Sequence, residues 1–487
     1  MYGVQERLGD CLKTCVPALQ AGQVDHRLMA VYAAALLRVG RADEAVNLMK
    51  HIAMARTQST GVMSGGDPHH LSALANSMLY DHTATPGDLF AAHFTYGRLL
   101  NSEVPVPPTI FSQSFDPERK LRFGIVSPDL RIHPSTRFLE PILENIDRER
   151  FEVVLYSTSE REDEFTERYK RLADLWRPAV KLSVRELTDR IRADAVDVLL
   201  DAAGHTQGNR LLSFHLRPAP VQATWLGYPN STGLSAMGYR IVDSITDPVG
   251  FDSQSTEKLV RIDPCFVCYR PPPDVPEVDP TPPSQREGAK GITFVCYNAI
   301  QKTNKEVVAA WGRILREVRG SRLLMRHRAT LQEDVRQDLA QRIAAAGASR
   351  EQVVVQPPAD GSAKNMVGYQ DADVALDTFP YPGVTTTCEA LWMGVPVVSI
   401  EGKSAASRQG LSIMHAGGLS EFVVKTPDDY VALAVKLAAD APRRAELRRT
   451  LRPTLAASAL RDEKGYTRKF ENALRTMWRE RCAAGNV

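Results

Sequence analysis

The sequence predicts an α/β protein with two Rossmann-like lobes and a central cleft, preceded by a short all-α region. Three observations support this fold class. Strands and helices alternate from Leu121 onward, the proline-rich run 271–283 interrupts the alternation, and the alternation restarts at Ile292. Alternation of this kind is typical of parallel sheets that helices cover on both faces. Two successive stretches of domain size therefore predict two lobes.

Length and composition agree with a multidomain globular protein. The chain has 487 residues, which is long for one domain, with 43% apolar and 24% charged residues. Its 60 basic and 58 acidic side chains nearly cancel, so we expect neither a nucleic-acid nor a membrane partner. We see no apolar run long enough to cross a bilayer, and residues 1–16 lack the layout of a signal peptide. We therefore expect a cytoplasmic location.

Residues 1–118 are predicted to be helical and similar to tetratricopeptide (TPR) repeats. Apolar residues at helical spacing precede a turn at Val39–Arg41, and a second helix is expected over 42–53. One such hairpin cannot bury both its faces, so we expect it to stack on neighbouring elements. Two further helices are predicted over 70–80 and 86–100, followed by a linker over 102–117.

The remaining domains follow from the strand and helix patterns. We expect an N-terminal lobe on the acceptor side over 119–287, a C-terminal donor-binding lobe over 288–460, and a terminal helical segment over 461–487 that packs back on the lobes. The predicted strands are 121–126, 151–157, 196–200, 292–296, 322–325, 353–356, 374–376 and 395–400. The predicted helices are 135–146, 163–173, 184–193, 305–318, 331–346, 387–393 and 463–481.

Two short patterns could suggest metal sites, and we interpret both as structural. Cys265 and Cys268 form a single C-x-x-C without a second ligand pair, and the alternation around them predicts a strand that continues to Tyr269. Asp371 and Asp373 have the D-x-D spacing of some metal-dependent sugar transferases. They precede their strand, however, and ligands bind beyond the carboxyl ends of parallel strands. We therefore predict a turn here and no metal.

Candidate chemical groups of the first lobe follow two of its strands. His133 lies in the segment after strand 121–126, where a histidine can act as a general base at neutral pH. Asp201 and His205 follow strand 196–200, and Gly204 and Gly208 in the same segment permit close backbone approach. The alternatives are a helix-entry histidine for His133 and a buried carboxylate that caps a turn for Asp201.

In the second lobe, Asn298 and Lys302 follow strand 292–296. A lysine at a strand end is well placed to neutralise a diphosphate leaving group. The alternative is a solvated surface lysine, which is the commoner situation for a single lysine.

A stronger signal follows strand 374–376, where a glycine turn and three threonines open a helix. Free amide groups and the helix dipole form an anion site there, and the hydroxyls add donors. Glu389, one turn into the helix, can accept hydrogen bonds from ribose hydroxyls. The alternative is a threonine-capped helix with a favourable acid near its start. The predicted site consists of Gly383, Thr385, Thr386, Thr387 and Glu389.

Together these segments resemble the protein O-linked N-acetylglucosamine transferase family, with its bacterial and Spindly-like O-fucosyltransferase relatives. The matching pieces occur in family order and are specific only in combination. They are Ser127–Thr136, Gly204–Gly208, Leu216–Pro229, Asn298–Lys302, Leu376–Gly394 and Ala406–Arg408.

The resemblance implies a GT-B fold and an inverting glycosyltransferase that uses neither a metal nor another cofactor. The implied donor is a nucleotide sugar, with UDP-GlcNAc as first choice, and the implied acceptor is a Ser or Thr hydroxyl of a protein or peptide. Lys302 would steady the donor diphosphate, Thr385 and Thr386 would grip the phosphates, and Glu389 would hold the ribose.

On the acceptor side, the resemblance makes His133 the candidate base and places His205 nearby. Val384 and Ala299 depart from the family pattern, where histidine and glutamine are common. Several alternatives therefore stay open. One is an O-fucosyltransferase that uses GDP-fucose, or an enzyme that uses UDP-glucose, and another is a catalytically weak scaffold that binds a nucleotide sugar. A third is a transferase that acts on a glycan or a small molecule.

Overall fold

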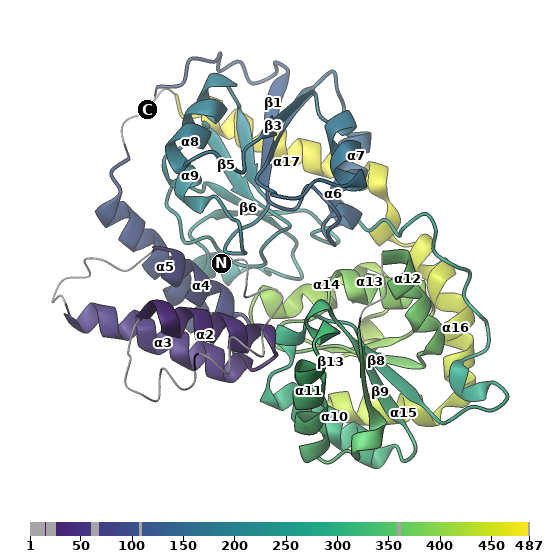
Figure 1. Cartoon of the computed structure of the whole chain (residues 1–487). Coiled ribbons are helices and arrows are strands. Elements are labelled where there is room, and N and C mark those ends of the chain that lie inside the picture. Colours follow the sequence, from purple (N-terminus) through teal and green to yellow (C-terminus); the bar gives the residue numbers. More distant parts are fainter. Residues whose placement is uncertain (1–14, 16–25, 60–67, 107–109, 358–361, 486–487) are drawn as a thin grey trace. The chain divides into compact units, whose positions relative to one another are not determined.

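A computed structural model describes residues 15, 26–59, 68–106, 110–357 and 362–485 of the chain (Figure 1). Contacts divide the chain into two compact units, each with its own parallel sheet. One unit comprises 63–76, 86–270 and 459–487, and the other comprises 1–62, 77–85 and 271–458. The predicted helical region 1–118 is thus shared between the two units.

The first sheet has seven parallel strands in the order β3-β2-β1-β4-β5-β6-β7. The chain turns from one direction of strand order to the other between β1 and β4, and ligands in open parallel sheets bind at such a switch point. The strands are β1 (Leu121–Ser127), β2 (Phe151–Ser157), β3 (Leu175–Pro178), β4 (Val198–Asp201), β5 (Val221–Thr224), β6 (Tyr239–Val242) and β7 (Lys258–Arg261).

Local sequence explains the helices around this sheet. Asp163 and Ser183 form capping boxes at the starts of α7 and α8, which fixes where these helices begin. The C-terminal helix α17 packs on this sheet, because Phe470 contacts Phe123 and Trp225 with ring centroids 5.9 and 5.0 Å apart (Figure 1). The helices are α4 (Pro68–Met78), α5 (Pro86–Glu103), α6 (Thr136–Asn145), α7 (Glu164–Leu172), α8 (Val184–Ala193), α9 (Leu211–His215) and α17 (Glu463–Ala483).

The second sheet has six parallel strands in the order β10-β9-β8-β11-β12-β13. Its first five strands repeat the order of the first sheet, so its switch point lies between β8 and β11. The strands are β8 (Thr293–Cys296), β9 (Arg322–Arg326), β10 (Val353–Gln356), β11 (Val374–Leu376), β12 (Val397–Ile400) and β13 (Val423–Val424).

Helices of the second unit include the predicted N-terminal hairpin, α2 and α3. The hairpin is longer than the sequence predicts, because α3 continues past residue 53 to residue 59. The helices are α2 (His26–Arg38), α3 (Ala42–Ser59), α10 (Lys305–Glu317), α11 (Glu333–Ala345), α12 (Ser362–Val367), α13 (Thr385–Trp392), α14 (Gln409–Ala416), α15 (Pro427–Ala439) and α16 (Ala441–Ala456).

The structure corrects two local predictions. The expected helix 331–346 starts instead as a 3-10 turn at Arg328–Leu331, and α11 follows it. The strand expected to reach Tyr269 ends at Arg261, and Cys265 and Cys268 lie beyond it as buried thiols. Their burial fits the structural interpretation of the C-x-x-C pattern.

None of the described helices combines the length and apolar character that a membrane span requires. Within the same part of the chain, we find no group of three or more His, Cys, Asp or Glu side chains arranged to hold a metal ion.

Candidate active site

Polar side chains gather at the switch point of the second sheet. Asn298 follows β8, and its Nδ2 donates to Asp377 Oδ1 (2.8 Å) and to Thr378 Oγ1 (2.9 Å) just after β11. Asn298 Oδ1 in turn accepts a hydrogen bond from the hydroxyl of Thr386 on α13. One amide side chain thus joins the ends of two strands to the start of a helix.

Asp377 is the centre of this group, although the sequence analysis did not select it. Its carboxylate also accepts from the Gly383 amide (2.6 Å) and from Ser399 Oγ (2.7 Å) on β12. Burial raises the pKa of this carboxyl, while the hydrogen bonds and Lys302 oppose that shift. An acid directly after a buried strand at a switch point was the signal available in the sequence.

Gly383 is required at its position by close packing. A Cβ atom there would lie 2.5 Å from Thr386 Oγ1 and 2.7 Å from both Asn298 Oδ1 and Thr387 Oγ1. Any larger residue would push the loop away from the helix start. The predicted glycine turn therefore allows the backbone to approach the threonines.

The start of α13 is arranged for an anion. Val384, the residue before the helix, makes no side-chain capping hydrogen bond to the first amides. These amides carry the partial positive charge of the helix terminus, where anions bind favourably. Thr385 and Thr386 are half-buried, Thr387 is buried, and Glu389 is half-buried one turn along the helix. The structure thus places all the predicted threonines on one helix end.

Lys302 lies next to the same loop. Its Nζ donates to the Pro382 carbonyl (2.6 Å) and lies 3.8 Å from the ring centroid of Tyr381. Burial lowers the pKa of Lys302 to about 8, against the opposing influences of Asp377 and Cys296. Lys302 is therefore held close to the start of α13, as the sequence predicts, and is not a freely solvated surface lysine.

These groups are chemically suited to a phosphate-bearing ligand. A cationic ammonium and a helix N-terminus lie on one short loop, and hydroxyl groups add further donors. Preorganised donors of this kind stabilise negative charge that develops on a leaving group. Asn298, Lys302, Gly383 and Thr386 are the predicted residues that the structure joins through contacts to this loop.

The end of β1 in the first sheet carries His133, the predicted base. Its side chain is 36% exposed, and its Nδ1 lies 2.8 Å from Ser135 Oγ and 3.6 Å from Asp129 Oδ2. Partners at Nδ1 orient the ring and fix its tautomer. The Ser135 amide donates to this Nδ1 (3.3 Å), and the carboxylate of Asp129, in the same segment, lies nearby but outside hydrogen-bond distance.

Asp201, at the end of β4, is in a different environment. The carboxylate is buried and accepts from the amides of Ala203 (3.2 Å) and Gly204 (2.8 Å) and from Thr224 Oγ1 (2.8 Å). Burial raises its pKa to about 6. These bonds are those of a buried carboxylate that caps a turn, the alternative that the sequence left open.

His205 is also buried, with 3% of its surface exposed. Its Nε2 donates to the Thr232 carbonyl (2.9 Å), and its Nδ1 accepts from Ser72 Oγ (2.8 Å). Burial lowers its pKa well below the usual value. Both ring nitrogens are therefore committed to protein partners in this structure.

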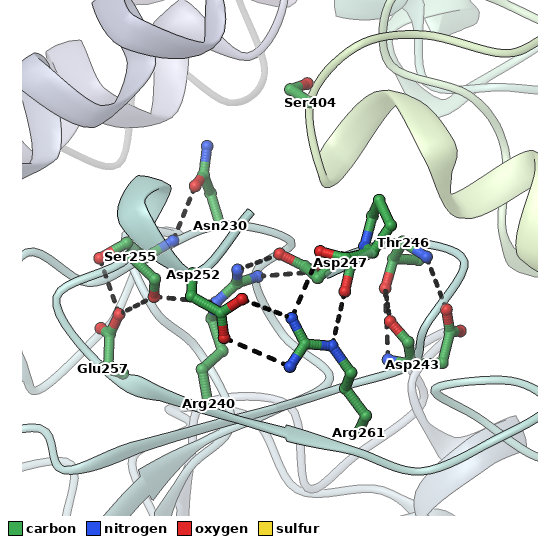
Figure 2. A network of polar contacts seen from close by, with 12 residues as sticks. Asn230, Arg240, Asp243, Thr246, Asp247, Asp252, Ser255, Glu257, Arg261 and Ser404 are labelled. Atoms are coloured by element: carbon green, nitrogen blue, oxygen red, sulfur yellow. Dashed lines mark hydrogen bonds and ion pairs between the residues drawn. The ribbon is translucent and has the colours of Figure 1, made fainter. Parts of the chain in front are cut away.

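The Thr232 carbonyl that accepts from His205 belongs to a loop that a polar network holds, and Figure 2 shows part of this network. Glu257 is buried and accepts from Ser231 Oγ (2.8 Å), the Thr232 amide (2.7 Å) and Ser255 Oγ (2.6 Å). Figure 2 shows Arg240 reaching Ser255 and also Asp247, its buried ion-pair partner. The network fixes the loop at Thr232 and hence the orientation of the His205 ring.

Asp373 has a structural role at the amino end of β11, as predicted. Its Oδ1 accepts from Ser284 Oγ (2.6 Å) and its Oδ2 accepts from the Thr293 amide (2.9 Å). Asp373 therefore anchors the start of the second sheet.

The architecture and this site define a class. Two parallel sheets with the same central strand order, one of them with an anion-binding helix start beside a lysine, make up the GT-B fold of glycosyltransferases. A model of one family matches residues 67–269 and 285–470. The chain belongs to glycosyl transferase family 41.

Similar proteins fall in the same group. A probable UDP-N-acetylglucosamine–peptide N-acetylglucosaminyltransferase SPINDLY of Solanum lycopersicum is 36% identical over 423 residues, which cover 85% of this chain and 45% of the relative. A probable enzyme of the same description, SEC of Arabidopsis thaliana, is 28% identical over 407 residues, covering 81% and 41%. The chain thus spans less than half the length of these curated relatives.

A solved structure matches over nearly the whole chain. A lysine-to-methionine mutant of the Thermobaculum terrenum O-GlcNAc transferase has a TM-score of 0.89 and 32% identity, and the match covers 99% of this chain and 90% of that one. This similarity extends to the helical region and confirms the GT-B fold.

Proposed function

We propose that this chain is an inverting, metal-independent glycosyltransferase that moves GlcNAc from UDP-GlcNAc to Ser or Thr hydroxyls of proteins. The observation that carries the proposal is that Lys302 bonds to the loop 377–383 directly and Thr386 is joined to it through Asn298. The matched relatives are named as probable peptide N-acetylglucosaminyltransferases and as an O-GlcNAc transferase, which supports the choice of donor and acceptor.

On the donor side, we assign charge stabilisation to Lys302 and to the α13 amides. As the bond between the anomeric carbon and the nucleoside diphosphate breaks, negative charge develops on the leaving phosphate oxygen. Lys302 and the amides at Thr385 and Thr386 would stabilise this charge in place. Glu389 would accept hydrogen bonds from the ribose hydroxyls, and Asn298 would hold the Thr386 hydroxyl in position.

On the acceptor side, we assign the proton transfer to His133. The acceptor hydroxyl attacks the anomeric carbon, the new carbon–oxygen bond forms as the bond to the diphosphate breaks, and the hydroxyl proton passes to the base. Of the two predicted histidines, His133 is half-exposed, whereas the ring nitrogens of His205 bond within the protein. We accordingly assign Asp201 and His205 to the support of this lobe.

The test is transfer itself. The purified chain would be incubated separately with UDP-GlcNAc, UDP-glucose and GDP-fucose in the presence of a cell lysate. Nucleoside diphosphate release and the mass gained by Ser- and Thr-containing peptides would be measured. UDP release with a GlcNAc mass increment, undiminished by a metal chelator, is the expected result. Release from GDP-fucose alone would support fucosyl transfer, and release from no donor would contradict the enzyme assignment.

A further inference from the structure

The turn of the N-terminal hairpin lies against the segment that carries Lys302. Gly40, between α2 and α3, has a positive φ of 77°, and a Cβ there would lie 2.6 Å from Thr303 Oγ1 and 2.7 Å from the Ile300 carbonyl oxygen. Arg342 on α11 secures this turn, with hydrogen bonds to the carbonyls of Val39 (3.0 Å) and Gly40 (2.9 Å). The contact requires a residue without a side chain and is thus closely packed.

The same hairpin also helps to cap the N-terminus of α10, which begins shortly after Lys302. Asp43 Oδ2 accepts from the Lys305 amide (3.1 Å). Beside it, Asn304 Oδ1 caps the helix by accepting from the next two amides. Asn304 Nδ2 donates to the Phe379 carbonyl (2.6 Å). The hairpin, α10 and the loop 377–383 are therefore linked by polar contacts in the residues that follow Lys302.

Tyr80, in the segment after α4, contacts Lys302 indirectly, through the ring of Tyr381. Its buried ring lies 5.5 Å from the Tyr381 ring, centroid to centroid, and Tyr381 lies against Lys302 Nζ. The Tyr80 hydroxyl bonds with the Gln301 side chain, and burial raises the pKa of this phenol to about 12. Two aromatic rings, inclined at 36° to each other, and one ammonium are therefore in contact in succession. We call this group the Tyr80 stack.

The Tyr80 stack is tied to the hairpin by its neighbour, Asp81. This carboxylate accepts from Lys50 Nζ on α3 (2.7 Å) and from the Thr83 amide (2.9 Å). The segment 77–85 is thus fixed to α3 on one side while Tyr80 supports Tyr381 on the other.

We propose that the helical hairpin and segment 77–85 brace the donor site, and that Tyr80 is a positioning residue that holds Tyr381 and Lys302 in place for a nucleoside diphosphate. The inference rests on the proposed function and extends it: the N-terminal helices act on the donor side in addition to any role toward protein acceptors. Tyr80 acts through Tyr381, so its loss weakens donor binding while the fold is kept.

The experiment is titration of UDP into the full chain by calorimetry, with Tyr80→Leu compared with Tyr80→Phe. The Phe variant keeps the ring, so we expect near-wild-type affinity. The Leu variant loses the support under Tyr381, so we expect the dissociation constant for UDP to rise about tenfold. Thermal melting of each variant would be measured alongside, to show that the protein is folded.

The pH dependence of UDP affinity separates positioning from general destabilisation. Lys302 faces Asp377, the Cys296 thiol and the Tyr381 ring. In the wild type, affinity should fall as the pH rises through about 8, because Lys302 loses its charge there. Opening the Tyr80 stack to water should raise the pKa of Lys302, so the alkaline fall should move to higher pH in the Leu variant and not in the Phe variant.

Each result has a defined meaning. A folded Leu variant with wild-type affinity and an unmoved alkaline fall would overturn the inference. If the Leu variant does not fold, Arg342→Met tests the same brace from α11, and unchanged UDP affinity in that folded variant would overturn it instead. A wild-type chain that binds neither UDP nor GDP contradicts the proposed function itself, which distinguishes the two failures.

Discussion

In the first sheet, the segments after β1 and β4 carry the half-exposed His133 and a buried pair, Asp201 and His205. In the second sheet, the segments after β8 and β11 carry Lys302, the Asn298 amide and the start of α13. The strand order around the two switch points is the same. The first sheet has α4 and α5 packed over its β4 end, where Ser72 and Tyr96 contact His205. Identical topology therefore supplies two places for a ligand, and local packing decides which of them keeps polar groups available.

The largest effect on the transfer rate should come from removing Lys302, the cation at the second switch point. Lys302→Ala should lower the transfer rate about 10³-fold or more, since it removes charge that stabilises the leaving diphosphate. The fold should survive, as judged by thermal melting. Lys305→Ala, at an exposed position three residues further on, is the matched control and should transfer at a near-normal rate. Equal activity in both variants would show that the second switch point is not the donor site.

The two histidines of the first switch point should respond in opposite ways. His133→Ala should reduce kcat about 10²-fold with little change in Tm, because it removes a base and no core contact. His205→Ala should instead lower the free energy of unfolding by about 2 kcal/mol, because it strips partners from Ser72 Oγ and the Thr232 carbonyl in the interior. Steady-state kinetics and thermal melting of the two variants measure this contrast. The reverse pattern would make His205 the base.

Thr386 offers a finer test of the second switch point. Thr386→Val keeps the shape of the side chain but loses the hydroxyl that donates to Asn298, so UDP affinity should fall about fivefold to tenfold. Thr386→Ser keeps the hydroxyl and should restore most of that loss. Calorimetric titration of UDP into both variants is the measurement. Equal UDP affinities in the Val and Ser variants would show that the Thr386 hydroxyl does not contribute to UDP binding.

A further prediction concerns the pH dependence of stability and His93, which is buried in the unit of the first sheet. Burial lowers the pKa of His93 to about 4, so the unfolded chain binds its proton first as the pH falls below 6.5. The stability this group contributes is complete above pH 6.5 and is lost as the pH falls toward 4, by about 2 kcal/mol at pH 5. The raised pKa of Asp201 stabilises the folded chain as the pH falls, so it opposes this loss of stability. The lowered pKa of His205 adds to the loss.

His93→Gln should therefore lose less stability than the wild type between pH 7 and pH 5. Urea denaturation at the two pH values gives the comparison. An equal or larger acid loss in the variant would show that protonation of His93 does not contribute to the pH dependence.

The elements that carry the donor site were largely predictable from local patterns. Strands 151–157, 353–356 and 374–376 have the predicted bounds, and most other strands differ by only one or two residues. Lys302 and Thr386 converge as predicted, because each follows directly from the end of a neighbouring strand in a parallel sheet. Short strands such as β3 and β6 escaped notice, since four residues give little periodicity.

The parts that escaped prediction depend on contacts between distant residues. The burial of His205 requires Ser72 and Tyr96, which lie more than a hundred positions earlier in the chain. The Tyr80 stack joins residues some three hundred positions apart. Contacts between residues so far apart in the sequence cannot be predicted from local hydrophobic periodicity or from motif spacing. Asp377 was visible in the sequence, but only the structure shows how many donors it holds.

The most direct test of the account is amide hydrogen exchange of the full chain with and without UDP. If the second switch point binds the diphosphate, UDP should slow exchange of the amides from Gly383 to Cys388, at the start of α13, and leave the amides from Asp201 to Gly208 largely unchanged. Protection confined to Asp201–Gly208, with none at α13, would contradict the assignment of the donor site to the second sheet.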